Sequence, residues 1–366
     1  MLNMTQITKQ IPGSRSPQDG NFPGVRLGVQ FTRYPGMEDL PLLASLRQAV
    51  EDGFTLVVLN NIAAELSGEL PDGLDEVAAE AGRAGVELQL GLGCAGPVGE
   101  PAAVRRELRK SLARGLELGI KEFFVYTRSV REGMVEQGRF LDHPAQLRVI
   151  QANLQALAEQ ARNNNARINV KTHEDLASTE VRSLVETLDP AVFSIGLDVA
   201  NLVVRAEDPH EVAGTLGPSI RMTHLEDVVL FPVQHGYRRR LCAVGEGVLD
   251  WNVLLGSLLG SGVRDFTVEQ HRGKFDTPVF DRSWFRYEPH LDAAGVGQLA
   301  RLGVLTHDAV SGGHIPALAD WDDDPTPAER RRQLLYSAAT LRRILTSIGA
   351  GIAAPATILS GEEGLS

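Results

Sequence analysis

The chain has 366 residues, a formal net charge of -11, and 43% hydrophobic and 23% charged residues. This length suffices for one large α/β domain or two smaller ones, and the composition is typical of a soluble globular protein. The acidic charge and the lack of a long basic run argue against nucleic-acid binding. Two cysteines, Cys94 and Cys242, provide neither a disulfide framework nor a cysteine-rich zinc site. No stretch predicts a membrane span or a signal peptide, so we expect a cytoplasmic protein.

In chain order, short apolar segments alternate with segments of helical spacing. After a disordered tail over residues 1–23, we expect eight strands, at residues 25–31, 54–59, 86–92, 122–126, 167–171, 193–198, 220–224 and 265–269. Helices are expected at residues 38–52, 72–84, 100–118, 144–163, 178–188, 209–216 and 251–259. Eight such units predict an α/β fold of the closed (β/α)8 TIM barrel type. The alternative is an open doubly wound sheet, but no Gly-x-Gly-x-x-Gly turn follows the first strand.

The remaining quarter of the chain has a different pattern. We assign residues 24–272 to the barrel and residues 273–366 to a C-terminal loop and helical extension packed on it. Helices are expected at 296–307 and 327–348, and residues 281–290 are expected to form a loop over the barrel mouth. No second core or internal repeat is visible in the sequence, so we interpret this region as an appendage to the barrel.

Three of the predicted strands end in metal-binding residue types. Asp198 ends the sixth strand, His224 the seventh and Glu269 the eighth. Because the carboxyl ends of barrel strands meet at one mouth, these side chains are expected to converge there. An Asp, a His and a Glu from separate strands are suited to a divalent metal ion with open coordination positions.

Five short runs in chain order resemble the xylose isomerase-like TIM barrel family, and the resemblance covers roughly residues 25–272. The runs are Lys171-Thr-His173, Asp198-Val-Ala-Asn201, His224-Leu-Glu-Asp227, Gly245-Glu-Gly247 with Asp250-Trp251, and Val268-Glu269. The resemblance implies one divalent ion (Mn, Mg, Co or Zn) on Asp198, His224 and Glu269. It also implies an acid/base role for Glu269.

The fifth-strand position departs from the family pattern, because Lys171 stands where the family often has a Glu ligand. Three interpretations stay open. The metal binds the other three ligands and Lys171 acts as a cationic acid or electrostatic anchor, which is the interpretation we favour. Alternatively, Glu174 replaces the missing ligand, or the metal is lost and the ammonium group takes its place.

Further residues near the strand ends are candidates for substrate binding. His173 is expected to bind a substrate hydroxyl or to orient Lys171 or Glu174, and Asn201 to contact substrate. Asp227 either binds substrate, supports His224 or caps the following loop. His271 either faces the mouth or is exposed.

An arginine run, Arg238-Arg239-Arg240, is placed in a loop over residues 232–241. It is either a solvated charge run or an anion clamp for a carboxylate or phosphate group. In the second case we expect one arginine to face inward, and Arg238 is the candidate that we name.

The resemblance implies a metal-dependent isomerase or epimerase that acts on a small keto sugar or sugar acid through an enediolate. The alternative is a decarboxylase of a 3-oxo sugar acid, of the type found in apiose breakdown, with Lys171 as the proton donor. A non-catalytic sugar-binding barrel is the third hypothesis. The expected partner is the sugar itself, without nucleic acid or membrane, and a homodimer is compatible with the resemblance.

Overall fold

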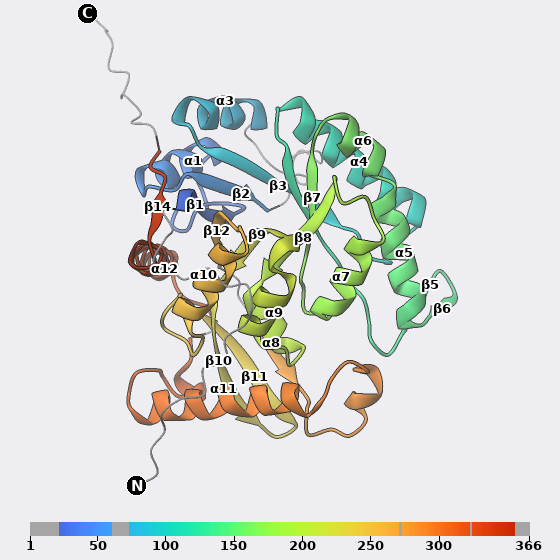
Figure 1. Ribbon diagram of the computed structural model, residues 1–366, viewed down its shortest axis with the longest axis vertical. Helices are drawn as coiled ribbons and strands as arrows, with labels where there is room; N and C mark the ends of the chain where they lie inside the picture. Colours follow the sequence, from blue (N-terminus) through green and yellow to red (C-terminus); the bar gives the residue numbers. More distant parts are fainter. Residues whose placement is uncertain (1–21, 61–72, 271–272, 323, 356–366) are drawn as a thin grey trace, which may run out of the picture.

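Eight parallel strands form a closed barrel in the computed structural model, which describes residues 22–60, 73–270, 273–322 and 324–355 (Figure 1). Strand β12 pairs with β1 and so closes the barrel. The TIM barrel prediction is therefore confirmed. The barrel strands are β1 (Phe22–Phe31), β2 (Leu56–Leu59), β3 (Glu87–Cys94), β4 (Glu122–Tyr126), β7 (Arg167–Lys171), β8 (Phe193–Asp198), β9 (Ile220–Leu225) and β12 (Asp265–Val268).

Helices surround these strands and cover their outer faces (Figure 1). They are α1 (Leu42–Glu51), α3 (Leu74–Ala84), α4 (Pro101–Glu117), α5 (His143–Gln155), α6 (Ala158–Asn163), α7 (Ser178–Glu186), α8 (Val199–Val204), α9 (Pro209–Leu216) and α10 (Trp251–Gly260). The single helix expected over residues 144–163 is wrong, because α5 and α6 are separate. At the break, the amide of Leu157 donates to the carbonyl of Leu154, three residues back, instead of four.

The register of the barrel brings the strand ends that carry the candidate residues to one level. Lys171 pairs with Gly196, and Asp198 pairs with His224. His224 in turn pairs with Thr267, two residues before Glu269. Every residue of β8 and of β12 is buried, as expected for strands enclosed by side chains on both faces. The candidate residues Asp198 and Glu269 therefore lie at the ends of strands that are fully enclosed in the protein.

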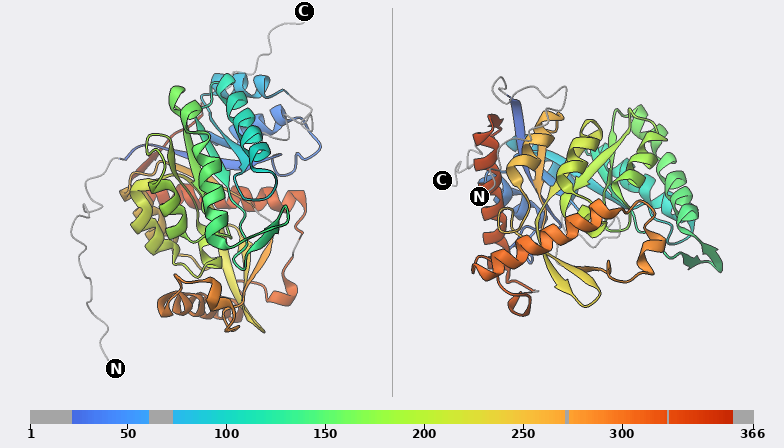
Figure 2. Two further views of the ribbon diagram at one scale, coloured as in Figure 1. Left: turned by 90° about the vertical axis from the view of Figure 1, so that its right-hand side faces the viewer. Right: turned by 60° about the horizontal axis from the view of Figure 1, so that its bottom comes forward.

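A small antiparallel sheet lies outside the barrel, between the mouth and helix α11 (Figure 2). It contains β10 (Asp227–Val233), β11 (Gly236–Cys242) and β13 (Lys274–Thr277). The predicted loop over residues 232–241 is wrong, because β10 and β11 form a hairpin there. Val229 and Phe231 of β10 pack with Ile315 in a separate apolar cluster that holds the sheet against the C-terminal extension.

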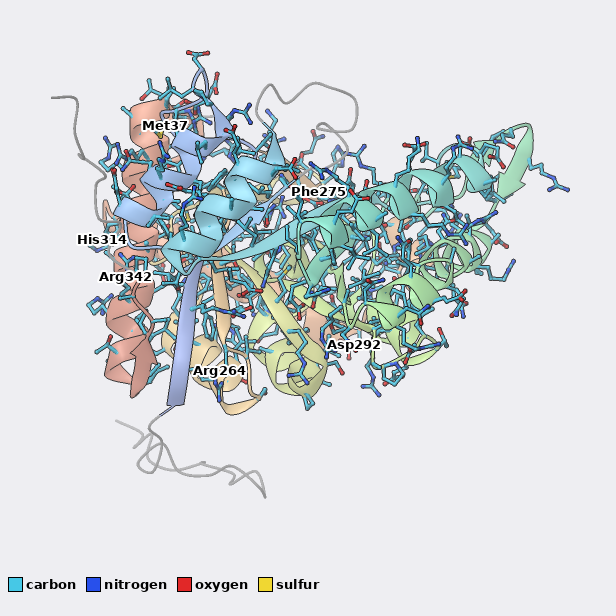
Figure 3. The ribbon with its side chains drawn as sticks, turned by 90° about the horizontal axis from the view of Figure 1, so that it is seen from above. Met37, Arg264, Phe275, Asp292, His314 and Arg342 are labelled. Atoms are coloured by element: carbon cyan, nitrogen blue, oxygen red, sulfur yellow. The ribbon has the colours of Figure 1, made fainter. Side chains whose placement is uncertain are left out.

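The C-terminal extension contains α11 (Ala293–Ser311), α12 (Pro327–Ser347) and β14 (Ala350–Ile352). The two expected helices are present, with α11 longer than predicted, whereas β14 pairs with β1 and was not predicted. Leu334 and Leu341 of α12 belong to the same hydrophobic core as the barrel. Arg342, which is labelled in Figure 3, donates to the carbonyls of Asp52 and Gly53 at 3.0 and 2.9 Å. The extension is therefore joined to the barrel by both apolar and polar contacts.

Further short elements within the described residues are the β5–β6 hairpin (Met134–Glu136 and Arg139–Leu141) and 3-10 helices at Gly217–Ser219, Trp284–Tyr287 and Leu318–Asp320. Within the predicted loop over residues 281–290, Glu288 pairs with Arg205, which follows α8, and lies 3.8 Å from Arg131, which follows β4. The segment thus contacts loops on the mouth side of the barrel. Among the described residues, no helix has the length and apolarity needed to cross a membrane.

Candidate active site at the barrel mouth

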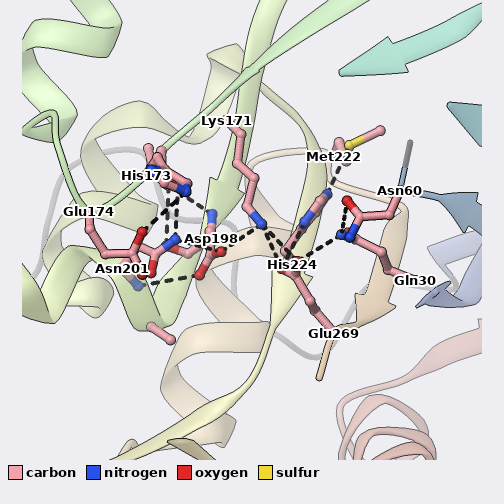
Figure 4. Close-up of polar contacts among 12 residues, drawn as sticks. Gln30, Asn60, Lys171, His173, Glu174, Asp198, Asn201, Met222, His224 and Glu269 are labelled. Atoms are coloured by element: carbon pink, nitrogen blue, oxygen red, sulfur yellow. Dashed lines mark hydrogen bonds and ion pairs between the residues drawn. The ribbon is translucent and has the colours of Figure 1, made fainter. Parts of the chain in front are cut away.

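Four ionisable side chains meet at the C-terminal ends of neighbouring strands. Lys171 comes from β7, Asp198 from β8, His224 from β9, and Glu269 directly follows β12 (Figure 4). All four are buried, with exposed fractions of 3%, 1%, 0% and 3%. We call these four residues the mouth cluster. Buried charges in proteins are normally paired or coordinate a metal, so such a group requires close internal compensation.

The Lys171 ammonium group lies between the two carboxylates of the mouth cluster. Its Nζ atom is 2.9 and 2.8 Å from the two oxygens of Glu269, and 2.9 Å from Oδ2 of Asp198. His224 contacts Glu269 through Nδ1 at 2.9 Å, and its Nε2 lies 3.2 Å from the sulfur of Met222. One cation therefore compensates two carboxylates in this arrangement.

Burial and neighbouring charges act in opposite directions on the Lys171 pKa. Burial lowers it, but the charges of Glu269 and Asp198 outweigh this effect, so the pKa lies above its ordinary value and the amine is protonated. Burial lowers the pKa of His224, and the charge of Lys171 lowers it further. His224 is therefore neutral near pH 7, which is the form that binds metal ions.

The donor set of the mouth cluster fits a divalent ion. Asp198, His224 and Glu269 each offer one ligand atom, and these atoms lie within 4.8 Å of one another. Two carboxylates with a neutral imidazole suit Mn, Mg, Co or Zn. An ion at this place would share its carboxylate oxygens with Lys171, so both the favoured interpretation of Lys171 and the one in which the ammonium replaces the metal agree with the geometry.

Glu174 does not lie with the three candidate ligands. Its carboxylate is 3.2 Å from Arg239 and 3.2 Å from His173. His173 also lies 3.2 Å from Asp175 through Nδ1, and its ring lies 5.6 Å from that of Tyr126. These contacts do not support the interpretation in which Glu174 replaces the missing ligand, because the possible metal-binding group consists of Asp198, His224 and Glu269. They connect His173 to Glu174 rather than to Lys171.

Asn201 and Arg239 connect the mouth cluster to the small antiparallel sheet. The Asn201 amide donates to Oδ2 of Asp198 at 2.8 Å and accepts from Arg239 at 2.8 Å (Figure 4). Arg239 is only 3% exposed. Arg238, the predicted inward-facing arginine, instead forms a pair with Asp276 near the surface. Arg239 faces inward and Arg238 does not, because successive side chains on a strand such as β11 point to opposite faces.

The predicted substrate-binding role of Asp227 is not supported. Its carboxylate is fully buried and accepts hydrogen bonds from the amides of Val228, Gly245 and Leu249 and from the Trp251 indole at 2.6 Å. A side chain at Gly247 would collide with this carboxylate, since its Cβ would lie 2.2 Å from Oδ1. Asp227 thus caps the loop after β11. The candidate His271 lies outside the described residues.

Sequence reasoning missed Gln30. This β1 residue donates from Nε2 to Glu269 at 2.7 Å and to Asn60 at 3.1 Å, and it is 7% exposed. Its position at the end of an apolar strand was the available signal. Barrel closure then places β1 next to β12, which brings Gln30 to Glu269.

A cavity of about 900 Å³ adjoins the mouth cluster. Glu269 lines it together with Gln30 and Asn60, whereas Lys171, Asp198 and His224 do not line it. Residues of the C-terminal extension form its other side. A ligand in the cavity would thus meet the mouth cluster at Glu269.

Comparison with known proteins identifies the family. The model of the xylose isomerase-like TIM barrel matches residues 46–280, more than half of the chain. The chain belongs to this family. Solved structures with low sequence identity share the fold of this chain. At such identity the similarity is evidence of the fold alone.

One such structure is the IolI protein with a bound zinc atom, with a TM-score of 0.52 and 15% identity over 80% of this chain and 100% of that one. Another is D-psicose 3-epimerase in the presence of D-fructose, with a TM-score of 0.52 and 11% identity over 78% of this chain and 98% of that one. A third is 3-keto-D-glucoside 4-epimerase from E. coli, with a TM-score of 0.52 and 15% identity over 73% and 100%.

Two curated relatives match shorter stretches. The uncharacterized protein YihM of Escherichia coli K12 is 27% identical over 116 residues, which is 32% of this chain and 36% of that protein. The 3-oxo-isoapionate decarboxylase of Pectobacterium atrosepticum is 29% identical over 93 residues, 25% of this chain and 34% of the decarboxylase. The alignments thus span about a third of each relative's length.

Proposed function

We propose that this chain is a sugar isomerase or epimerase-type enzyme. It would act on a small keto sugar or sugar acid through an enediolate, with a divalent ion on Asp198, His224 and Glu269. The observation that carries this proposal is the convergence of these three side chains, all buried, at the mouth of a barrel of this family. Active sites of TIM barrels lie at this end.

Each residue of the mouth cluster would have a separate role in such a reaction. A bound divalent ion would polarise a carbonyl group and stabilise the negative charge that develops on its oxygen. A carboxylate oxygen of Glu269 would accept the proton from the neighbouring carbon, and Gln30 would hold that carboxylate in place. Lys171 would return a proton from Nζ or hold a negatively charged oxygen. Burial of the cluster would keep water away from the enediolate.

A second candidate is decarboxylation of a 3-oxo sugar acid. Loss of carbon dioxide from such an acid leaves an enolate, which needs one proton donor and no carboxylate base at the fifth strand. The protonated Lys171 between two carboxylates is such a donor. The partial similarity to a 3-oxo-isoapionate decarboxylase supports the same reaction.

Charge balance adds support for an acidic substrate. With His224 neutral, Lys171, Asp198 and Glu269 together carry one negative charge. A bound dication would turn this into one positive charge within a buried site. A substrate carboxylate would compensate it, and uncompensated buried charge is costly. This consideration favours sugar acids over neutral sugars at the reacting end.

One experiment in heavy water separates the two reactions. The purified protein would be incubated with added Mn²⁺, with keto sugars and with 3-oxo sugar acids, while deuterium incorporation and carbon dioxide release are followed. Deuterium at the carbon next to the carbonyl, without carbon dioxide, identifies an isomerase or epimerase. Stoichiometric carbon dioxide release identifies the decarboxylase. Neither signal across both substrate classes would contradict the proposal and favour a sugar-binding barrel.

A further inference from the structure

The cavity beside the mouth cluster has one wall from the barrel and one from the C-terminal extension. Gln30, Glu269 and Gln270 lie on the barrel side, while Trp321 and Gln333 come from the extension. The match to the family ends at residue 280, so the second wall lies beyond the matched region. The extension thus supplies part of a binding surface next to the candidate reaction centre.

The cavity is continuous with the mouth cluster through Glu269. This carboxylate lines the cavity and contacts Lys171 through both oxygens at 2.9 and 2.8 Å. A substrate that reacts at Glu269 would therefore extend away from the cluster into the cavity. What the cavity accepts determines the remainder of the substrate.

Two glutamine side chains in the cavity wall lack hydrogen-bond partners for their oxygens. Gln30 and Gln270 both line the cavity, and neither Oε1 atom has a partner among the described residues. Their nitrogens are assigned by their partners, because Gln30 Nε2 donates to the Glu269 carboxylate and Gln270 Nε2 donates to the carbonyl of Arg330 at 2.9 Å. Both oxygens are therefore acceptors that need a donor, such as a hydroxyl group.

The charge of the cavity wall disfavours an anionic ligand within the cavity. Carboxylate side chains outnumber guanidinium groups among the lining residues. Of these guanidinium groups, Arg330 is paired with Glu38, and Arg240 lies 5.7 Å above the ring of Trp321. A phosphate group would thus meet net repulsion, whereas a neutral hydroxyl-rich group would not.

The volume of the cavity is sufficient for a ligand larger than one small sugar. Pockets for small molecules range from roughly 300 to 1,000 Å³, and about 900 Å³ lies near the upper end of this range. We propose that the cavity between barrel and extension is a subsite for a neutral glycosyl group, so that the substrate is a glycosylated keto sugar or sugar acid. The inference rests on the proposed function, because it places the reacting end at Glu269.

Binding of unreactive polyols tests the subsite independently of catalysis. Calorimetry with the full-length protein in the presence of Mg²⁺ would compare maltitol, which carries a glucosyl group, with sorbitol, which lacks it. We expect maltitol to bind about tenfold more tightly or better. Gln333→Trp, which fills the cavity from the extension, should reduce maltitol affinity to the level of sorbitol. Gln155→Ala, a change on the exposed end of α5, is the control and should leave both affinities unchanged.

Three results would overturn the subsite: equal affinity for both polyols, undetectable binding of maltitol, or unchanged maltitol affinity in a folded Gln333→Trp variant. Sorbitol 6-phosphate binding more tightly than maltitol would overturn its neutral character. The binding experiment can fail or succeed independently of the proposed function. Maltitol binding that depends on Gln333, in a protein without turnover of any keto sugar or sugar acid, would keep the subsite and reject the reaction. Turnover without preference for glycosylated substrates would do the reverse.

Discussion

Lys171 binds both carboxylate oxygens of Glu269 across the barrel mouth, at 2.9 and 2.8 Å, although β8 and β9 lie between their strands. The same ammonium group is 2.9 Å from Asp198. A single cation therefore pairs with two candidate metal ligands. This relationship makes Lys171 the residue whose replacement is most informative.

Replacing Lys171 with methionine should abolish turnover while metal binding persists. The variant keeps an unbranched side chain, one atom shorter, but removes the proton donor and leaves two buried carboxylates for the ion. Turnover would be measured with the substrate found in the heavy-water assay, and metal by mass spectrometry. Lys110→Met, on the exposed face of α4, serves as the control. An active Lys171→Met protein would reject the catalytic lysine.

Replacing Arg239 should lower the metal affinity of the site, because Arg239 positions Asn201. Arg239 holds the Asn201 amide, which donates to Asp198, so its loss leaves that carboxylate less fixed. We expect Arg239→Met to reduce metal affinity about tenfold or more, as is common for residues behind metal ligands. Arg238→Met is a matched control on the neighbouring position, since Arg238 pairs with Asp276 near the surface. Equal effects of the two variants in a metal titration would contradict this role.

Asp227→Asn should reduce stability without changing substrate affinity. The Asp227 carboxylate accepts four hydrogen bonds from N–H donors, and the amide nitrogen of an asparagine would face one of these donors. A loss of about 1–3 kcal/mol in the free energy of unfolding is expected. Urea unfolding and the KM of the folded fraction are the measurements. If KM rises strongly while stability is retained, Asp227 belongs to the substrate site after all.

Glu180 should make stability depend on acidic pH. Burial raises the pKa of Glu180, but the hydrogen bond to His143 and the charge of Arg131 outweigh burial and lower it from 4.5 to about 2. The contacts of Glu180 with His143 and Arg131 thus contribute about 3 kcal/mol to the free energy of unfolding at neutral pH. Because the folded-state pKa is depressed, this contribution is complete above pH 4.5 and is lost as the pH falls towards about 2.

The test for Glu180 is urea unfolding of Glu180→Gln and of the unchanged protein at several pH values between 7 and 3. The stability difference should be largest near neutrality and should shrink below pH 4.5. Glu186→Gln on the same helix, whose side chain is 59% exposed, is the control. A difference that stays constant with pH would show that Glu180 does not act through its charge.

The barrel was largely predictable from sequence, whereas the layer over its mouth was not. The strands ending at Lys171 and Asp198 have the predicted bounds, because their apolar residues recur at every second position. The β10–β11 hairpin was missed because three consecutive arginines conceal the strand pattern. In the hairpin, Arg239 faces Asn201 and Arg240 faces Trp321 of the extension. The sequence alone does not show which arginine lies on which face.

The candidate metal ligands could be predicted from their positions at strand ends. The residues that contact and orient these ligands could not. Gln30 contacts Glu269 only because the barrel closes between β1 and β12, which lie far apart in sequence. Arg239 rather than Arg238 faces the site because of the phase of one strand. Such choices depend on register and closure, which local sequence does not encode.

The most direct test of the account is the metal content of the protein purified without chelator and then equilibrated with Mn²⁺, Mg²⁺, Co²⁺ or Zn²⁺. Mass spectrometry should find about one equivalent of a divalent ion, lost in Asp198→Ala and in Glu269→Ala. Loss in both variants, with folding intact by circular dichroism, would support the metal-dependent enzyme. No bound ion under any of these conditions would contradict it, and Lys171 would then be the permanent cation of the site.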